Sequence, residues 1–380
     1  MERERMDVSK YLSLHSLLKS ISSNFIALFV PLLILQQIGY KPTMVYIVVM
    51  YLSLTISLIS FYKLITKKPL VAISLHIIFS IVSYILIAGF ELNVFTIIIN
   101  AICSGVSQAL YTSPIFAIIS STDKKNNKMF SKHQIFSFLG SIIMILFNGY
   151  IIGANKSFSV WLTCLVSFII YLASLIPFLI IRSDIKIEQN EDISIRELIN
   201  KTKEFNIFHV VFGLQNLIVS VILPLYLYIN NLSIQTIAYI VALVNVAKII
   251  FTLLANHLYK KDRSFVSILL GGVSFVIASI LLLKSSNSVF IYCLTIIMNL
   301  SFPLFFVPNC NYYGKKMKDY SYQAMVLREI LVQMFRPLIV LPFIFIENLT
   351  SFIYMGIIFT VVILITGYFL FKMKSSNQNC

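Results

Sequence analysis

Long apolar runs set the strongest limit on what this chain can fold into. A helix needs about 20 consecutive, mostly apolar residues to cross a lipid bilayer. Twelve stretches qualify, at 11–37, 43–62, 70–90, 93–119, 133–153, 158–181, 206–230, 235–256, 264–283, 288–312, 322–346 and 350–371. The alternating ten-residue segments of a membrane β-barrel are absent. The sequence therefore predicts an all-α polytopic membrane protein with 12 transmembrane helices.

The distribution of positive charge predicts how these spans are oriented. Only 12% of the residues are charged, and the net charge is +15. When the loops are assigned alternately to two sides, 23 Lys and Arg residues fall on the side of the N-terminus and three on the other side. Cytoplasmic loops carry the excess of Lys and Arg in membrane proteins, so both termini are expected in the cytoplasm. Because topology explains the basic excess, a role in nucleic-acid binding is not expected.

The ends and the composition of the chain predict its localisation. The opening "MERERMDVSK" carries charges of both signs, and no small-residue cleavage site follows it, which indicates an uncleaved first helix. The Lys-, Asn- and Ile-rich composition favours the plasma membrane of a bacterium. None of the five cysteines lies in a Cys-x-x-Cys pair or at ligand spacing from a histidine. They are expected to be packing residues, and no metal or cofactor is predicted.

The two halves of the sequence resemble each other at an offset near 193 residues. Pro31 matches Pro224, Thr43 matches Thr236, and the doublet Lys67-Lys68 matches Lys260-Lys261. The order of these matches at one offset indicates a six-plus-six duplication. Several secondary carriers have this architecture and hold their substrate between the halves, near the middle of the bilayer.

The duplication predicts two helical domains and a linker. The N-terminal six-helix bundle is expected over residues 1–181 and the C-terminal bundle over 206–380. The polar segment 182–205 lies between them. Within it, Ser194 and Glu197 form a capping box, which predicts a short amphipathic helix on the cytoplasmic face.

Two six-helix repeats, a central cytoplasmic loop and basic doublets after spans two and eight resemble the major facilitator superfamily. The resemblance covers essentially the whole chain and implies a carrier whose spans three, six, nine and twelve are outer helices. It also implies that the doublets lie in gating loops. In that family an aspartate precedes the doublet, and here Lys63 occupies its position. The fifth helix lacks the glycine-proline signature of proton-driven antiporters, so the coupling mechanism is not carried over.

Five charged residues fall inside the predicted spans, on spans one, eight and eleven: Lys19, Lys248, Arg328, Glu329 and Arg336. An ionised side chain within the bilayer is costly and commonly marks a functional site. Arg328 is close enough to the start of its helix to reach back toward the headgroups, whereas Arg336 lies too deep. Pro337 removes a backbone hydrogen bond beside Arg336 and is expected to let the helix bend.

Polar residues recur at helical spacing on the same and neighbouring spans. Together with the charges they give the predicted substrate-binding set, which is Lys19, Asn100, Gln108, Asn148, Gln215, Asn216, Asn245, Lys248, Gln333 and Arg336. The predicted coupling and gating set is Glu329, Arg328, Pro337, Lys67, Lys68, Lys260 and Lys261. On span eleven Glu329, Gln333 and Arg336 share one helix face. We therefore expect Arg336 to face a polar cavity with Glu329 as its switch.

The intramembrane charges admit two interpretations. Lys248 and Glu329 can form a structural ion pair across helices, and polar stripes can serve only to join helices. One carboxylate cannot neutralise Lys19, Lys248 and Arg336 together, so the surplus is positive. A positively lined cavity of low dielectric favours anions, and the cargo is expected to be anionic or zwitterionic.

The leading functional prediction is a secondary transporter that moves a small organic solute by alternating access, with export slightly favoured. The alternative is a polysaccharide or lipid-linked oligosaccharide flippase of a different fold. Metalloprotease, nucleophile-elbow and P-loop motifs are absent, so an enzyme or an ATP-driven pump is not expected. No sizeable soluble domain supports a receptor. A monomer in the bilayer is expected, with a proton or another ion as the coupling partner.

Overall fold

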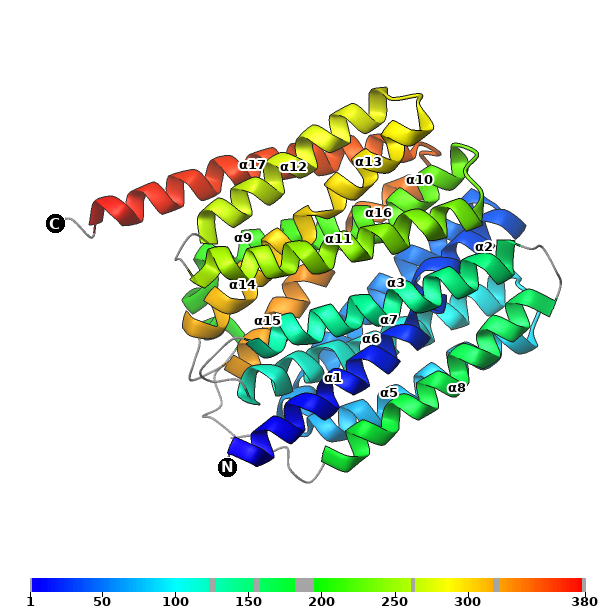
Figure 1. Ribbon diagram of the computed structural model, residues 1–380, viewed down its shortest axis with the longest axis horizontal. Helices are drawn as coiled ribbons and strands as arrows, with labels where there is room; N and C mark the ends of the chain where they lie inside the picture. The colour runs from blue at the N-terminus through cyan, green and yellow to red at the C-terminus, as the bar shows by residue number, and fades with distance from the viewer. Residues whose placement is uncertain are drawn as a thin grey trace.

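The computed structural model describes residues 2–122, 128–153, 158–181, 195–260, 264–316 and 321–377. These parts of the chain form helices and contain no strand. The long helices run side by side (Figure 1), with the N-terminal half in blue to green and the C-terminal half in yellow-green to red. Both marked termini lie at the same end of the bundle.

The helices of the N-terminal half follow the predicted spans closely. The first span consists of α1 (Glu2–Asn24), the π-helical turn η1 (Phe25–Phe29) and α2 (Val30–Gln37). The others are α3 (Tyr40–Ser60), the short α4 (Tyr62–Lys67), α5 (Pro69–Gly89), α6 (Val94–Thr122), α7 (Lys128–Gly153) and α8 (Phe158–Ile181).

The C-terminal half repeats this arrangement. Its first span consists of α9 (Ile195–Leu217), the π-helical turn η2 (Ile218–Ile222) and α10 (Leu223–Ile229). The remaining elements are α11 (Ile234–Lys260), α12 (Ser264–Lys284), α13 (Ser288–Asn299), α14 (Ser301–Lys316), α15 (Ser321–Met334), α16 (Arg336–Val340), the 3-10 turn η4 (Leu341–Ile344) and α17 (Leu349–Asn377).

The segment between the halves differs from its prediction. Residues 182–194 lie outside the described part of the chain. From Ile195 onward α9 runs without a break into the seventh span, so the amphipathic helix expected in the linker is the first part of a longer helix. Glu197 lies in its first turn, where a carboxylate interacts favourably with the helix dipole.

Ten helices of the described chain are long and apolar enough to cross a membrane. The predicted eleventh span is broken into α15, α16 and η4, because Pro337 and Pro342 each remove an N–H from the helical ladder. The twelfth lies in α17, Leu349–Asn377. Helices therefore form at all twelve predicted positions, and the interrupted one carries three of the five intramembrane charges.

The duplication is visible in the backbone itself. The turns η1 and η2 start at Phe25 and Ile218, which are 193 residues apart, and each precedes a helix with proline at its second position. A proline cannot supply the next N–H of an α-helix, and the ladder widens to a π turn, a feature frequent at functional sites. The two turns contact each other between the halves.

The two halves touch along their length and at both ends of the bundle. Helix α7 packs on α11, and α3 packs on α15 and α16. At one end Tyr40 donates a hydrogen bond to the carbonyl of Ile346 at 3.2 Å. Toward the other end the rings of Phe116 and Phe306 lie 6.0 Å apart, centroid to centroid. The space between these contacts holds the polar residues of the spans.

Candidate functional site

Two adjoining cavities are lined by buried polar groups, among them two of the intramembrane lysines. The first, here called the N-terminal cavity, has a volume of about 270 Å³ and lies among α1, α5, α6 and α7. The second, called the central cavity, has about 240 Å³ and lies between the halves, against α1, α7, α10, α11 and α14. Ala27 and Ser137 line both. The two cavities therefore share a wall formed by α7 and the π turn of the first span.

Lys19 of α1 is the one Lys or Arg side chain that lines the N-terminal cavity. Its side chain is buried, with 9% of the residue exposed. The ammonium nitrogen lies 5.2 Å from the ring centroid of Tyr111 and 4.6 Å from that of Tyr171. Such cation–π contacts stabilise the charge only in part, and no Asp or Glu lines this cavity.

Two histidines line the N-terminal cavity beside Lys19. Nδ1 of His76 is 2.8 Å from the carbonyl oxygen of Ser107, so this nitrogen carries a proton and donates it. Nε2 of His76 is buried and has no hydrogen-bond partner. His133 contacts the hydroxyl of Ser16 through Nδ1, and that hydroxyl itself donates to the carbonyl of Leu12. Because the serine proton is already used, His133 must be the donor.

His133 also lines this cavity, although it is not among the predicted site residues. It follows Lys132 at the start of the fifth predicted span. The structure turns Lys132 outward and His133 inward on α7. Consecutive residues on a helix point about 100° apart. Ser131, Gln134 and Ser137 recur every three residues on α7, and this polar spacing is the signal that could have revealed the inward face beside His133.

Lys248 of α11 lines the central cavity with its neighbour Asn245. Its ammonium nitrogen lies 5.8 Å from the ring centroid of Phe138 and 5.3 Å from that of Phe302. Among the ion pairs of the described residues none joins Lys248 to Glu329. The cross-helix pair that the sequence left open is therefore absent, and Lys248 is a second buried ammonium beside a polar cavity.

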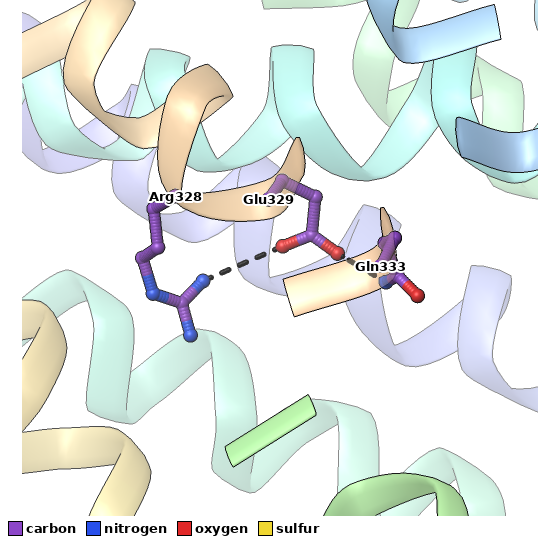
Figure 2. A network of polar contacts seen from close by, with 3 residues as sticks. All are labelled: Arg328, Glu329 and Gln333. Carbon is purple, nitrogen blue, oxygen red and sulfur yellow. Dashed lines mark hydrogen bonds and ion pairs between the residues drawn. The ribbon is translucent and has the colours of Figure 1, made fainter. Parts of the chain in front are cut away.

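Glu329 is instead held by its own helix (Figure 2). One carboxylate oxygen lies 3.4 Å from a guanidinium nitrogen of Arg328, and the other accepts a hydrogen bond from the Gln333 amide at 2.6 Å. Arg328 was expected to reach toward the headgroups, but only 1% of it is exposed. Its guanidinium carbon lies over the rings of Phe212 and Phe306 at 5.5 and 5.0 Å, which encloses the ion pair in an apolar surrounding.

Arg336 lies outside both cavities, which corrects the expectation that it shares a cavity with Lys19 and Lys248. Its Nε donates to the carbonyl of Gly213 on α9 at 3.0 Å, and its guanidinium carbon is 4.9 Å from the Tyr51 ring centroid on α3. A Cβ at Gly213 would overlap the carbonyl oxygen of Val332, so only glycine lets α9 lie this close to α15. Arg336 therefore joins the two halves at the point where the eleventh span breaks.

The other predicted substrate-binding residues fall into three groups. Gln108 lines the N-terminal cavity, and Asn216 and Asn245 line the central cavity. Asn100 donates to the backbone and hydroxyl of Ser83, and Gln215 donates to Thr360, so both join helices. Asn148 is fully buried, with no partner for either side-chain polar atom.

The structure describes three of the four lysines in the basic doublets. Lys67 ends α4 and Lys68 precedes α5, and both side chains are exposed. Lys260 is the last residue of α11. Lys261 lies outside the described residues. Pro337 is buried at the start of α16.

The described part of the chain offers no metal site. No group of three or more His, Cys, Asp or Glu side chains comes together there. Cys103, Cys164 and Cys293 are free thiols. The chemistry that the two cavities provide is therefore electrostatic attraction and hydrogen bonding.

Comparison with solved structures identifies the fold. The nucleoside transporter NupG matches with a TM-score of 0.68 at 11% identity, covering 94% of this chain and 98% of that one. A bacterial homologue of the human drug peptide transporters PepT1 and PepT2 gives 0.69 at 10% identity, with coverage of 97% and 99%. A bacterial homologue of the iron transporter ferroportin gives 0.67 at 14% identity, with coverage of 94% and 98%. At these identities the likeness shows the fold alone.

The sequence comparisons identify the family. No curated protein sequence matches this chain. The family model of the Major Facilitator Superfamily matches residues 12–328, which is most of its length. The match confirms the resemblance found in the repeats and decides against a flippase of a different fold. The chain belongs to the major facilitator superfamily and is a multi-pass membrane transporter of that family.

Proposed function

We propose that this protein is a secondary carrier that moves a small organic solute with a negative charge, an anion or a zwitterion, by alternating access. The observation that carries the proposal is the pair of buried ammonium groups, Lys19 and Lys248. Each lines a polar cavity, each is 9% exposed, and neither has a carboxylate within ion-pair distance among the described residues.

The electrostatic argument follows from where the single buried carboxylate is used. Of the carboxylates whose side chains the structure describes, Glu329 alone is buried, and it pairs with Arg328. Charges in a low-dielectric interior interact several times more strongly than in water. An anion that enters either cavity would meet a lysine that has no other counterion, whereas a cation would meet repulsion.

The position of the cavities supports alternating access. The central cavity has walls from both halves, and the halves contact each other toward both ends, through Tyr40 with Ile346 and through Phe116 with Phe306. A carrier that opens to one side at a time must break one set of these contacts while it keeps the other. The side-chain contacts at these two ends are a hydrogen bond with an exposed ion pair, Lys41–Glu347, and an aromatic pair, which such an exchange can break and re-form.

Glu329 is the residue that we propose for coupling. Protonation of its carboxylate would remove the negative charge that faces Arg328, and α15 packs against α3 and α6 of the other half. The charge state of this one residue would thereby change the contact between the halves. Such a step makes transport dependent on the proton gradient.

The test is efflux, the direction that we expect, from proteoliposomes loaded with a pool of labelled organic anions, zwitterions and cations. The proposal predicts loss of anion and zwitterion flux in Lys248→Met and retention of flux in Lys284→Met. Lys284 is a matched control, because it is an exposed lysine at the end of α12. Equal flux of cations and anions through the wild-type protein, or unchanged anion flux in Lys248→Met, would refute it.

A further inference from the structure

The N-terminal cavity combines one uncompensated charge with several unused hydrogen-bonding groups. Among its lining residues Lys19 has no counterion, and Ser23, Gln108, Thr112 and Gln134 make no side-chain hydrogen bond in the structure. Ser23, Gln108 and Thr112 are half-buried, and no polar atom of these four side chains is among the buried atoms that lack a partner. Their hydrogen-bonding groups therefore remain available to a ligand in the cavity.

His76 adds a hydrogen-bond acceptor with a fixed orientation. Its Nδ1 proton is committed to the carbonyl of Ser107 at 2.8 Å, so the neutral ring presents Nε2 as an acceptor. That atom is buried and has no protein partner. The rings of His76 and Tyr111 lie 4.8 Å apart, and Lys19 lies over the same Tyr111 ring. The ammonium and the free imidazole nitrogen are thus held around one aromatic side chain.

The remaining hydroxyls hold these groups in place. Ser80 and Ser107 bond to each other at 2.7 Å, Ser83 and Ser104 at 3.0 Å, and the Tyr111 hydroxyl lies 3.0 Å from Nε2 of His15. These bonds link α5 to α6 and α6 to α1. A network of this kind pre-orients the binding groups, which lowers the entropic cost of binding.

We propose that the N-terminal cavity binds a small hydroxylated carboxylate with a single negative charge, its carboxylate on the ammonium of Lys19 and one of its hydroxyls donating to Nε2 of His76. The single lysine and the absence of acidic residues in the lining match one negative charge. Amide and hydroxyl groups both donate and accept, so Gln108, Gln134 and Thr112 match further hydroxyls. The volume of about 270 Å³ lies below the usual range of drug-sized sites, about 300–1,000 Å³.

This inference rests on the proposed function for its biological meaning, but it concerns a different cavity. The proposed function requires only that a negatively charged solute passes between the halves. The inference adds that the N-terminal bundle by itself holds the groups that recognise the solute, and that hydroxyls as well as charge are recognised.

The test measures equilibrium binding of three probes to the full-length protein in detergent micelles by isothermal titration calorimetry. Gluconate carries the charge and the hydroxyls, hexanoate carries the charge alone, and sorbitol carries the hydroxyls alone, all on six-carbon chains. We expect gluconate to bind about tenfold more tightly than either of the others. Hexanoate lacks the hydroxyls that bond to His76 and its neighbours, and sorbitol lacks the carboxylate that bonds to the charged Lys19. Equal affinities for gluconate and hexanoate would overturn the inference.

Three substitutions assign the effect to atoms. Lys19→Met removes the charge and is expected to weaken gluconate binding by about tenfold or more. His76→Asn keeps a donor for the carbonyl of Ser107 and removes Nε2, so it should weaken gluconate about fivefold and leave hexanoate unchanged. Lys284→Met, at an exposed lysine that lines neither cavity, should not change gluconate binding. Thermal unfolding of each variant shows whether it is folded.

The outcomes separate this inference from the proposed function. If Lys248→Met abolishes gluconate binding and Lys19→Met does not, the anion binds in the central cavity and the inference is wrong, while anion transport stands. If gluconate binds as expected but the wild-type protein moves no anion in proteoliposomes, the inference stands and the proposed function fails. If Lys19→Met and wild type bind gluconate equally, the site is refuted directly.

Discussion

Glu329→Gln should destabilise the protein because it removes the counterion of a buried arginine. Arg328 is 1% exposed, and its Nε and Nη2 already lack hydrogen-bond partners. The guanidinium therefore has no second acceptor ready when the carboxylate charge is lost. Removing one partner of a buried ion pair typically costs about 3–5 kcal/mol. We expect about 3 kcal/mol, because the amide of the substituted side chain still offers one oxygen.

The size of the effect can be converted into a melting temperature. Unfolding entropies of about 2.1 cal/mol/K per residue give a chain of 380 residues about 0.8 kcal/mol/K. A loss of 3 kcal/mol then lowers Tm by about 4 °C. The measurement is thermal unfolding in detergent micelles, followed by circular dichroism at the helical minimum.

A double variant distinguishes the ion pair from a general packing defect. Arg328→Met combined with Glu329→Gln removes both charges, and replacing both members of a buried pair is often neutral. We expect the double variant to regain most of the Tm lost by Glu329→Gln. If the Tm loss of the double variant equals the sum of the losses in Arg328→Met and in Glu329→Gln, the two residues are not coupled. The argument from the buried charge is then refuted.

Five further variants test the contacts around the site and between the halves. Gly213→Ala should lower stability by about 1–3 kcal/mol, because its Cβ would overlap a backbone carbonyl of α15; an unchanged Tm would contradict this. Arg336→Gln should slow transport and change KM less than about twofold, since the residue lies outside both cavities; a large rise in KM would place it at the substrate. Pro31→Ala and Pro224→Ala should each slow amide exchange in the preceding π turn, measured by hydrogen–deuterium exchange, because an N–H is restored; unchanged exchange would contradict the role of proline. Lys41→Ala should leave Tm within about 1 °C, since its ion pair is exposed; a larger shift would make that pair structural.

The sequence predicts the helices well because one physical rule governs them. A span must satisfy every backbone group internally and present apolar side chains for about 20 residues, so helices occur at the predicted positions. The rule fails where proline intervenes. Pro337 predicts a bend, and the structure shows a one-residue interruption at Phe335 between α15 and α16. Whether a helix bends or breaks depends on which neighbours accept its freed carbonyls, and these come from elsewhere in the chain.

The site was predicted by residue type better than by position. Lys19 and Lys248 were selected because buried charge is costly, and both line cavities. The same reasoning selected Arg336, but its depth in the helix does not reveal that Gly213 and Tyr51 supply its partners. His76 is not among the predicted site residues, although it lines the N-terminal cavity. Its unpartnered Nε2 could not be foreseen, because that depends on the helices packed around it.

The duplication explains the frame of this protein but not its charges. The π turns η1 and η2 and their prolines recur at an offset of 193. The same offset places Phe212 opposite Lys19 and Thr55 opposite Lys248. Phe212 packs under Arg328, and Thr55 bonds its own helix at the carbonyl of Tyr51.

Neither lysine therefore has a charged counterpart in the other half, and the two cavities differ in their walls. A duplicated frame gives two similar halves that can rock against each other, as in alternating access. An asymmetric distribution of charge lets the solute be held more strongly by one half than by the other. In the binding mode that we propose, that half is the N-terminal bundle, because its cavity is lined by one lysine, two histidines and several hydroxyls. The C-terminal half contributes Lys248 to the central cavity.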